Sequence, residues 1–308
     1  MNIDRVILEF ISELRSDFLT GLFSLITHLG DGAVIILIIF ILYWCIDKRL
    51  GLKIGLAVSL GGIVNGILKS LFAVPRPWDR FEGFEAVESA KARATGYSFP
   101  SGHTSNAVCT YGSAAVCLKG RAIKIVLSVI IISVAFSRLY LGVHTPSDVL
   151  VSLVAGAAIV FLSSRLYGRL IKADHRTFLL TAVSAVAVPA AAAVFIRFKP
   201  YGGGYEFELV KDGYLACGLL AGLFAGWYFE RKYLDFSPSG GIIFQIVKTI
   251  AGLASSLLIM WLGGLAVDML PCIREAVYVV RYALTSFWAV FVYPLIFTKF
   301  KERKCSKQ

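Results

Sequence analysis

Two stretches of the chain, GYSFPSGH (residues 96–103) and SRLYLGVHTPSD (residues 137–148), determine how the rest of it is interpreted. Each contains a histidine at the start of a predicted helix. Ser101 is a suitable N-cap in the first stretch, and Thr145 followed by Pro146 is a typical helix start in the second. The first backbone N–H groups of a helix have no partner within it, so both starts can receive an anion.

The composition around these stretches is that of a membrane protein. Of the 308 residues, 57% are hydrophobic and only 17% are charged, whereas an ordinary soluble domain has about 25% charged residues. A helix needs about 20 apolar residues to cross a bilayer. We therefore predict an all-α, polytopic transmembrane helix bundle. The predicted segments are 16–30, 33–47, 51–73, 102–118, 123–141, 146–167, 177–196, 213–230, 241–266 and 273–298.

The positions of Lys and Arg predict how this bundle is oriented. Cytoplasmic loops are enriched in these residues, and placing both termini in the cytoplasm puts most of the basic loop residues inside. The net charge of +11 is then a topology signal, and we expect no nucleic-acid partner. We expect the protein in the plasma membrane. Segment 16–30 is the weakest span because its apolar run is short, and it is expected to be tilted or partly interfacial. The sequence does not indicate an oligomeric state.

The predicted up-and-down order places four polar groups on the same, outer face. Lys69 and Arg76 end the third segment, and residues 101–103 begin the fourth. Arg138 ends the fifth segment, and residues 144–148 begin the sixth. The spacing of the motifs does not impose this agreement, so it supports a single active site at the outer end of the bundle.

The residue types in this cluster suit phosphate chemistry. Asp148, one turn after His144, can hold an imidazole N–H and make the second ring nitrogen a nucleophile or base. His103 can donate or accept a proton, and Arg138 offers a planar clamp for phosphate oxygens. The structural alternatives are a capping role for Asp148, an ordinary helix-start position for His103, and basic residues that reach for the membrane surface.

No metal is expected at this cluster. Magnesium and calcium sites need several carboxylates, and the cluster has one. Two histidines and an aspartate can bind zinc in principle, but three adjacent cations would repel it. We therefore predict chemistry that is independent of metals and of any other cofactor.

The motifs resemble the three-part motif of the type 2 phosphatidic acid phosphatase (PAP2) superfamily. Every motif position is present and in order: Lys69-x6-Arg76-Pro77, Pro100-Ser101-Gly102-His103 and Ser137-Arg138-x5-His144-x3-Asp148. The resemblance implies a catalytic core over residues 1–167, made of an N-terminal interfacial helix and six transmembrane segments. Residues 168–308 contain no matching motif and are expected to form about four additional C-terminal transmembrane helices.

The resemblance also implies a role for each motif residue. His144 would attack phosphorus and form a phosphohistidine, and Asp148 would orient His144. His103 would protonate the leaving oxygen and then activate water. The remaining motif residues would hold the phosphate oxygens: Lys69, Arg76, Ser101, the Gly102 N–H and Arg138.

A lipid phosphate is the expected substrate, because the site lies at a bilayer boundary. Phosphatidate, undecaprenyl diphosphate and phosphatidylglycerophosphate are candidates. Trp78 heads a loop rich in aromatic residues, which suits contact with lipid, and ordinary anchoring at the interface is its alternative role. Arg281 lies about 12 Å inside the last helix and is a candidate second substrate contact. The alternative for Arg281 is that it reaches toward the membrane surface or pairs with an acid such as Glu275.

Three other functions are compatible with the sequence. Superfamily relatives that resemble glucose-6-phosphatase also have helices beyond the core, so a soluble ester such as glucose 6-phosphate is an alternative substrate. A phosphotransferase would pass the phosphoryl group to an alcohol instead of water. An anion transporter would use the basic cluster for binding alone, but it predicts inverted repeats that the sequence does not show.

Overall fold

The computed structural model describes residues 3–305 of the chain, with side chains described through residue 299. Within that range the structure consists of helices and loops without strands, so the all-α prediction is confirmed. The helical elements are α1 (Ile3–Glu13), α2 (Asp17–Ile26), η1 (Thr27–Gly30), α3 (Gly32–Ile41), η2 (Leu42–Ile46), α4 (Lys48–Phe72), α5 (Pro77–Arg80), α6 (Glu88–Lys91), α7 (Gly102–Ala107), η3 (Val108–Gly112), α8 (Ser113–Cys117), α9 (Arg121–Tyr140), α10 (Pro146–Leu170), α11 (His175–Phe198), α12 (Phe207–Tyr233), α13 (Ile242–Met269), η4 (Pro271–Ile273), α14 (Arg274–Phe287), η5 (Trp288–Val292) and α15 (Tyr293–Cys305).

Most of these helices are suited to a bilayer. Within the described residues, seven are long and apolar enough to cross a membrane, and a bent pair can add an eighth. This finding confirms a multi-pass membrane protein. The predicted segment 102–118 is not among the seven, because α7, η3 and α8 form one continuous run, Gly102–Cys117, that is shorter than each of those spans. The seven are Lys48–Arg80, Arg121–Tyr140, Pro146–Leu170, His175–Phe198, Phe207–Tyr233, Ile242–Met269 and Pro271–Lys299.

The N-terminal region differs from the prediction of two separate spans, 16–30 and 33–47. Residues Asp17–Gly30 and Gly32–Ile46 form one pair, bent by 52°. The break falls at Asp31, whose side chain accepts a hydrogen bond from the Ala33 N–H at 2.9 Å and caps α3. Both halves are apolar, but they follow one another toward the same end of the bundle instead of reversing direction.

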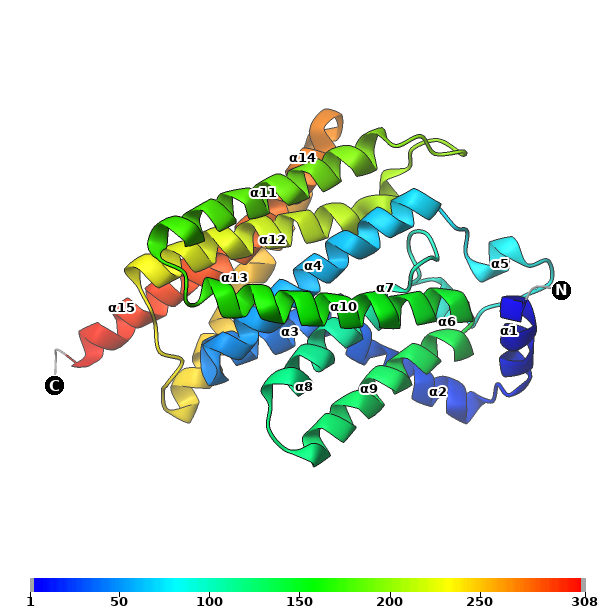
Figure 1. Ribbon diagram of the computed structural model, residues 1–308, viewed down its shortest axis with the longest axis horizontal. Helices are drawn as coiled ribbons and strands as arrows, with labels where there is room; N and C mark the ends of the chain where they lie inside the picture. The colour runs from blue at the N-terminus through cyan, green and yellow to red at the C-terminus, as the bar shows by residue number, and fades with distance from the viewer. Residues whose placement is uncertain (1–2, 306–308) are drawn as a thin grey trace.

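The N-terminal helix therefore lies at the end of the bundle that carries the motifs. Asp4 accepts hydrogen bonds from the N–H and hydroxyl of Ser147 at 3.1 and 2.9 Å. Arg15 donates to the Tyr140 carbonyl at 3.0 Å. Figure 1 shows the two termini at opposite ends of the molecule. The bent pair provides one candidate traverse where the sequence predicted two.

Helix α4 lies at the centre of the bundle. In Figure 1, α7 to α10 lie on one side of it, and α11, α12 and α14 lie on the other. A Cβ on Gly66 would lie 2.5 Å from the Gly213 Cα, and one on Gly62 would lie 2.7 Å from the Ala216 Cβ. Small residues thus let the backbones of α4 and α12 approach closely, as is common between membrane helices. This seam joins the motif-bearing helices to the C-terminal helices (α11–α15).

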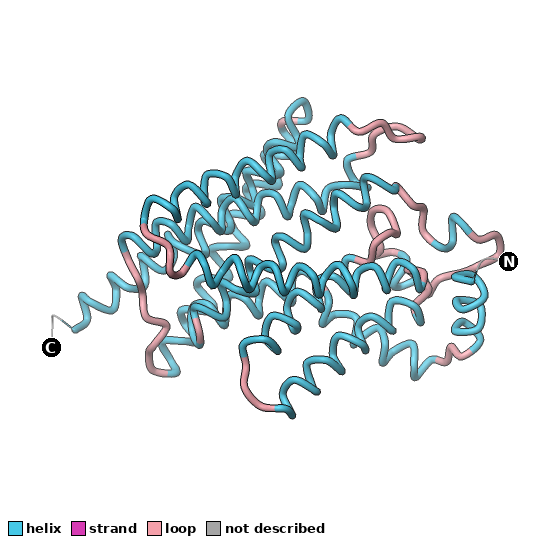
Figure 2. The backbone as a smooth tube through the Cα atoms, viewed as in Figure 1, coloured by secondary structure: helices cyan, strands magenta, loops and turns pink. Residues whose placement is uncertain are grey.

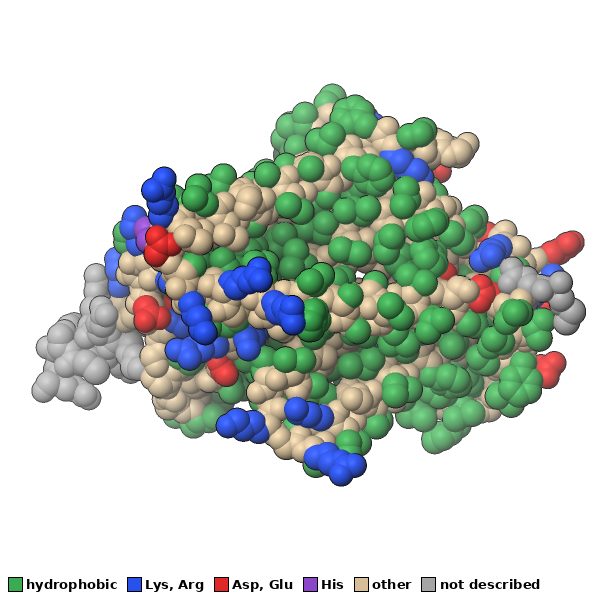
Figure 3. Space-filling model, viewed as in Figure 1, with side chains coloured by type: hydrophobic (Ala, Val, Ile, Leu, Met, Phe, Trp, Pro, Cys, Tyr) green, Lys and Arg blue, Asp and Glu red, His purple; other side chains and the backbone are tan. Residues whose placement is uncertain are grey.

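The two ends of the bundle differ in character. Figure 2 shows the longer loops at these ends, with helices filling the space between them. In Figure 3, the Lys and Arg side chains of the visible face gather mainly at the end with the α8–α9 and α10–α11 turns, and hydrophobic side chains cover the middle. The motif residues lie toward the opposite end, near α5 and α6.

Candidate active site

The two cations of the first motif lie on either side of the end of α4. The helix ends at Phe72, and Ala73 adopts a left-handed conformation with φ 46° and ψ 42°. This is the helix break that Pro75 predicts. Lys69 is 3% exposed and Arg76 is 6% exposed, so both charges are buried and require partners.

The loop of residues 95–97, here named the cation loop, supplies those partners through its backbone carbonyls. Lys69 Nζ donates to the carbonyl of Tyr97. Arg76 donates to the other two carbonyls, at 2.9 Å from Nε and 2.5 Å from Nη2. Phosphate oxygens bound at this position would compete with the same carbonyls for the same donors.

Asp148 links the start of α10 to His144. The Thr145 N–H donates to Asp148 Oδ2 at 2.8 Å, and the Asp148 N–H donates to the Thr145 hydroxyl at 3.3 Å, which forms the capping box. The same Oδ2 lies 3.3 Å from His144 Nδ1 and accepts the Ser98 hydroxyl at 2.6 Å. The geometry allows Asp148 to cap the helix and to orient the imidazole at once.

The neighbours of His144 define its tautomer. Arg76 Nη1 lies 3.0 Å from Nε2, and a guanidinium group can only donate. Nε2 is therefore the acceptor, and Nδ1 carries the proton toward Asp148. Burial, reinforced by the positive charge of Arg76, holds the pKa of His144 well below its usual range. The ring is thus neutral at pH 7, with its lone pair on Nε2.

The start of α7 forms a second wall of the site. The Thr104 N–H donates to the Ser101 hydroxyl at 3.4 Å, which confirms Ser101 as the N-cap. Gly102 and His103 are half-buried, although Ser101 is fully buried. A Cβ on Gly102 would meet nothing closer than Asn65 Oδ1 at 4.0 Å. The backbone at Gly102 is therefore open to close approach by a ligand.

Arg138 and His103 line one cavity of about 310 Å³. Arg138 is 4% exposed, and its Nη1 donates to the Thr27 hydroxyl at 2.6 Å. Its Nε is buried and has no hydrogen-bond partner within the described part of the chain. A buried donor without a partner is costly. Arg138 is therefore suited to donate a hydrogen bond to an anion bound in this cavity.

The sequence analysis missed three residues at this end of the bundle as functional candidates. His28 and Arg93 line the cavity, and Arg93 Nη1 lies 3.2 Å from His28 Nε2. Ser98 contacts Asp148, as described above. Ser98 stands only a few residues before the second motif, which is a weak signal, whereas nothing in the spacing of His28 or Arg93 indicates their position.

Most of the predicted site residues are brought to this end of the bundle. They are Lys69, Arg76, Ser101, Gly102, His103, Arg138, His144 and Asp148. Trp78 lies beside them, with its ring 6.0 Å from the Arg76 guanidinium carbon. Among the described residues, no group of three or more His, Cys, Asp or Glu side chains is arranged to hold a metal ion.

Arg281 lies elsewhere. Its side chain packs against Gly263 and Gly264 of α13, where a Cβ on Gly263 would lie 2.5 Å from the Arg281 Cγ. Glu275, its predicted alternative partner, is instead bonded by the Tyr205 hydroxyl at 2.9 Å and lies 3.5 Å from Arg197. Arg281 is therefore not paired with Glu275, and its role as a second substrate contact stays a prediction.

Comparison with known protein families gives two matches. The model of the PAP2 superfamily matches residues 50–172, which include all the motif residues. The model described as a PAP2 superfamily phosphatase, transmembrane extension, matches residues 214–305.

Individual relatives agree with these matches. A probable sphingosine-1-phosphate phosphatase of Dictyostelium discoideum is 28% identical over 69% of this chain and 54% of its own length. The phosphatidylglycerophosphatase B of Bacillus subtilis is 29% identical over 48% of this chain and 75% of its own length. The chain thus spans about half the length of the first of these relatives.

Among solved structures, Aquifex aeolicus LpxE is 25% identical with a TM-score of 0.47, over 54% of this chain and 96% of that one. A PAP2-type phosphatidylglycerolphosphate phosphatase from Bacillus subtilis is 27% identical with a TM-score of 0.44, over 53% and 83% of the two chains. The two family models and the relatives, which are themselves named as phosphatases, lead to one conclusion: the chain belongs to the PAP2 superfamily.

Proposed function

We propose that the chain hydrolyses a phosphate monoester or diphosphate of a lipid without a metal, through a phosphohistidine at His144. The observation that carries this proposal is the setting of the His144 ring. Asp148 lies at Nδ1 and Arg76 lies at Nε2, at 3.3 and 3.0 Å. A neutral imidazole with its lone pair directed into a basic, buried site is suited to attack phosphorus.

The reaction has two steps. In the first, Nε2 of His144 forms a bond to phosphorus, and the bond from phosphorus to the ester oxygen breaks. His103 gives its proton to that oxygen, and Asp148 stabilises the positive charge on the ring. In the second step, water attacks phosphorus, His103 takes its proton, and the N–P bond breaks to release inorganic phosphate.

The cations have to change partners for the first step to occur. Arg76 covers Nε2 in this structure, so its guanidinium must be drawn away by phosphate oxygens before attack. Lys69 would exchange the carbonyl of the cation loop for the same ligand. The Nε of Arg138 has no hydrogen-bond partner among the residues that the structure describes, and Ser101 and the Gly102 N–H complete the cradle. Preorganised donors of this kind stabilise the charge of a transferring phosphoryl group.

An exposed apolar residue in the wall of the cavity beside His103 favours a lipid ester as the substrate. Leu25 of α2 lines the cavity together with His103 and is 70% exposed on the outside of the bundle. An ester with its phosphate in this cavity would therefore have its apolar chain beside the bilayer. The relatives named above for phosphatidylglycerophosphate and sphingosine 1-phosphate support the same class.

The orientation is proposed from the charges at the two ends. Cytoplasmic ends of membrane proteins are enriched in Lys and Arg, and Figure 3 shows these side chains gathered away from the motif end. We place the site and the N-terminal helix at the outer face of the plasma membrane, and the C-terminus in the cytoplasm. We further assign residues 1–167 to the catalytic core and residues 168–308 to the additional helices.

Phosphate release by the purified protein in detergent tests the proposal. The panel contains phosphatidate, undecaprenyl diphosphate, phosphatidylglycerophosphate, sphingosine 1-phosphate and glucose 6-phosphate, without divalent metal and with EDTA. His144→Ala should abolish release. His175→Ala is the matched control, because His175 lies at the start of α11 and pairs with Tyr228 at 2.9 Å, away from the site.

Each result discriminates between functions. Release from lipids alone supports the proposal and ranks the headgroups. Release from glucose 6-phosphate would establish the soluble-ester alternative, and product that forms only with an added alcohol would establish a phosphotransferase. Near-normal activity in His144→Ala, or strong loss with EDTA, would overturn the mechanism.

A further inference from the structure

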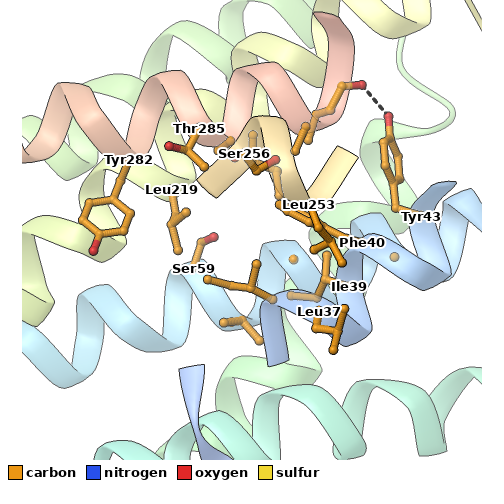
Figure 4. Close-up of a pocket in the computed structure, with 18 of the residues that line it drawn as sticks. Leu37, Ile39, Phe40, Tyr43, Ser59, Leu219, Leu253, Ser256, Tyr282 and Thr285 are labelled. Atoms are coloured by element: carbon orange, nitrogen blue, oxygen red, sulfur yellow. Dashed lines mark hydrogen bonds between the residues drawn. The ribbon is translucent and has the colours of Figure 1, made fainter. Parts of the chain in front are cut away.

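A second cavity, of about 380 Å³, lies between the motif-bearing helices and the C-terminal helices. Figure 4 shows its wall, to which α3 and α4 contribute Leu37, Phe40 and Ser59, and α12 and α13 contribute Leu219 and Leu253. The lining is almost wholly apolar and is distinct from the motif residues. The volume lies in the range of about 300–1,000 Å³ in which proteins bind small ligands.

This cavity opens sideways toward the bilayer. Leu37 of α3 and Leu257 of α13 both line it, and their exposed fractions are 37% and 68%. Both helices face lipid in the middle of the bundle, so an aliphatic chain is the ligand that the surroundings supply. An apolar void left empty would lose the packing contacts of its lining.

Arg281, for which the described residues provide no anionic partner, lies one helical turn beyond the cavity. Met260 lines the cavity, and Gly264 follows it by one turn of α13. The two Nη atoms of Arg281 lie 3.7 and 3.6 Å from the position of a Cβ on Gly264. The Arg281 Nε is buried and has no hydrogen-bond partner among the described residues. Its ring contacts are with Tyr278 and Tyr282, at 5.9 and 5.5 Å.

We propose that this cavity and Arg281 together bind one anionic phospholipid of the surrounding membrane, separate from the substrate. One aliphatic chain fills the cavity, and the phosphate group accepts hydrogen bonds from the Arg281 guanidinium. An arginine between membrane helices is costly unless it meets an anion, and basic pockets between such helices bind lipid headgroups. A lipid held there would bridge α3 and α4 to α13 and α14.

Native mass spectrometry of the full-length protein tests the site. The protein is released from bilayers with equal amounts of dioleoyl phosphatidylglycerol and dioleoyl phosphatidylcholine, which have the same chains and differ in charge. We expect one phosphatidylglycerol to be retained in preference. Arg281→Gln should lower the ratio of the two retained lipids about tenfold, as expected for one lost charge-assisted hydrogen bond.

Two matched controls separate this site from general attraction. Arg274→Gln removes the same charge from the same helix, where Arg274 lies over the Phe207 ring at 4.1 Å, and should leave the ratio unchanged. Ser256 lines the cavity, is 5% exposed, and its hydroxyl has no partner among the described residues. Ser256→Phe should therefore fill the cavity and reduce retention of both lipids, and Ser256→Ala should not.

Four results would overturn the proposal. They are equal retention of the two lipids by the parent protein, equal losses in Arg274→Gln and Arg281→Gln, undiminished retention in Ser256→Phe, and loss in Lys69→Gln without loss in Arg281→Gln. A loss in Lys69→Gln alone would place the lipid at the phosphate-binding cations of the active site. If Ser256→Phe does not fold, the two arginine variants decide the outcome alone.

Discussion

Tyr97 of the cation loop stacks on Tyr201 of the loop between α11 and α12, with ring centroids 6.3 Å apart and planes 8° from parallel. The neighbouring Gly96 has a φ of 72°, and a Cβ there would lie 2.8 Å from the Leu209 carbonyl of α12. The carbonyl of Tyr97 is the acceptor for Lys69. The C-terminal helices thus contact the loop that holds both cations of the first motif.

Tyr201→Ala should raise KM more than it lowers kcat. Loss of the stacked ring frees the cation loop, so Lys69 and Arg76 are less well placed when the phosphate group binds. A stacked aromatic pair contributes about 0.5–1.5 kcal/mol beyond its buried area, which corresponds to a rise in KM of about 2- to 12-fold. Steady-state kinetics with the best lipid substrate of the panel would measure the change.

The conservative variant Tyr201→Phe provides the control for this prediction. It keeps the ring and removes the hydroxyl, which donates to the Ile196 carbonyl at 2.8 Å. KM should stay near that of the parent protein. Equal effects of the alanine and phenylalanine variants would show that the hydroxyl, and not the stacking on Tyr97, matters.

The ring of His144 should stay neutral in mildly acidic solution. Its pKa is lowered by burial and by Arg76, so the proton is expected to bind only well below the ordinary value of about 6.5. The folded protein should therefore lose stability as pH falls below about 6.5, because the unfolded chain takes up this proton first. ¹⁵N NMR of histidine-labelled protein suits the test, since the chain has only 4 His.

Assignment of that signal requires the His144→Gln variant, in which it should disappear. Chemical shifts of a neutral ring with the proton on Nδ1 are expected throughout the range from pH 8 to pH 6. A His144 signal that titrates at pH 6.5 or above would contradict both the lowered pKa and the tautomer inferred from Arg76.

Ser98→Ala should reduce kcat about 10- to 100-fold, because a hydrogen bond to a charged group contributes about 1.5–3 kcal/mol. The Ser98 hydroxyl donates to the Oδ2 of Asp148 that also faces His144. Ser163→Ala is the matched control, since the Ser163 hydroxyl donates to the Val160 carbonyl of its own helix at 3.2 Å, away from the site. Comparable losses in the two variants would indicate a general effect on folding.

Local features of the fold could be predicted from the sequence, because neighbouring residues determine them. The Ser101 cap, the box formed by Thr145 and Asp148, and the helix break before Pro75 all depend on residues within a few positions. The spans from Arg121–Tyr140 onward also follow from the lengths of their apolar runs.

Other features required the folded chain. Hydropathy measures the length of an apolar run but not its direction, so the bend at Asp31 and the position of the N-terminal helix were missed. Ser98 and Asp148 are 50 positions apart, and Arg138 bonds Thr27 over a separation of 111 positions. The depth of Arg281 within its helix could be estimated from the sequence. That α13 packs over its side chain could not.

Gly66→Ala should destabilise the contact between α4 and α12, because its Cβ would lie 2.5 Å from the Gly213 Cα, which belongs to the backbone and cannot rotate away. Overpacking of this kind costs about 1–3 kcal/mol. The matched control is Gly168→Ala in α10, where a Cβ meets nothing within 4 Å and the better helix propensity of alanine should leave stability unchanged or raise it by up to about 1 kcal/mol. Thermal unfolding of the two variants in the same detergent measures the difference. If Gly66→Ala unfolds at the same temperature as Gly168→Ala, close backbone packing does not hold the C-terminal helices against α4.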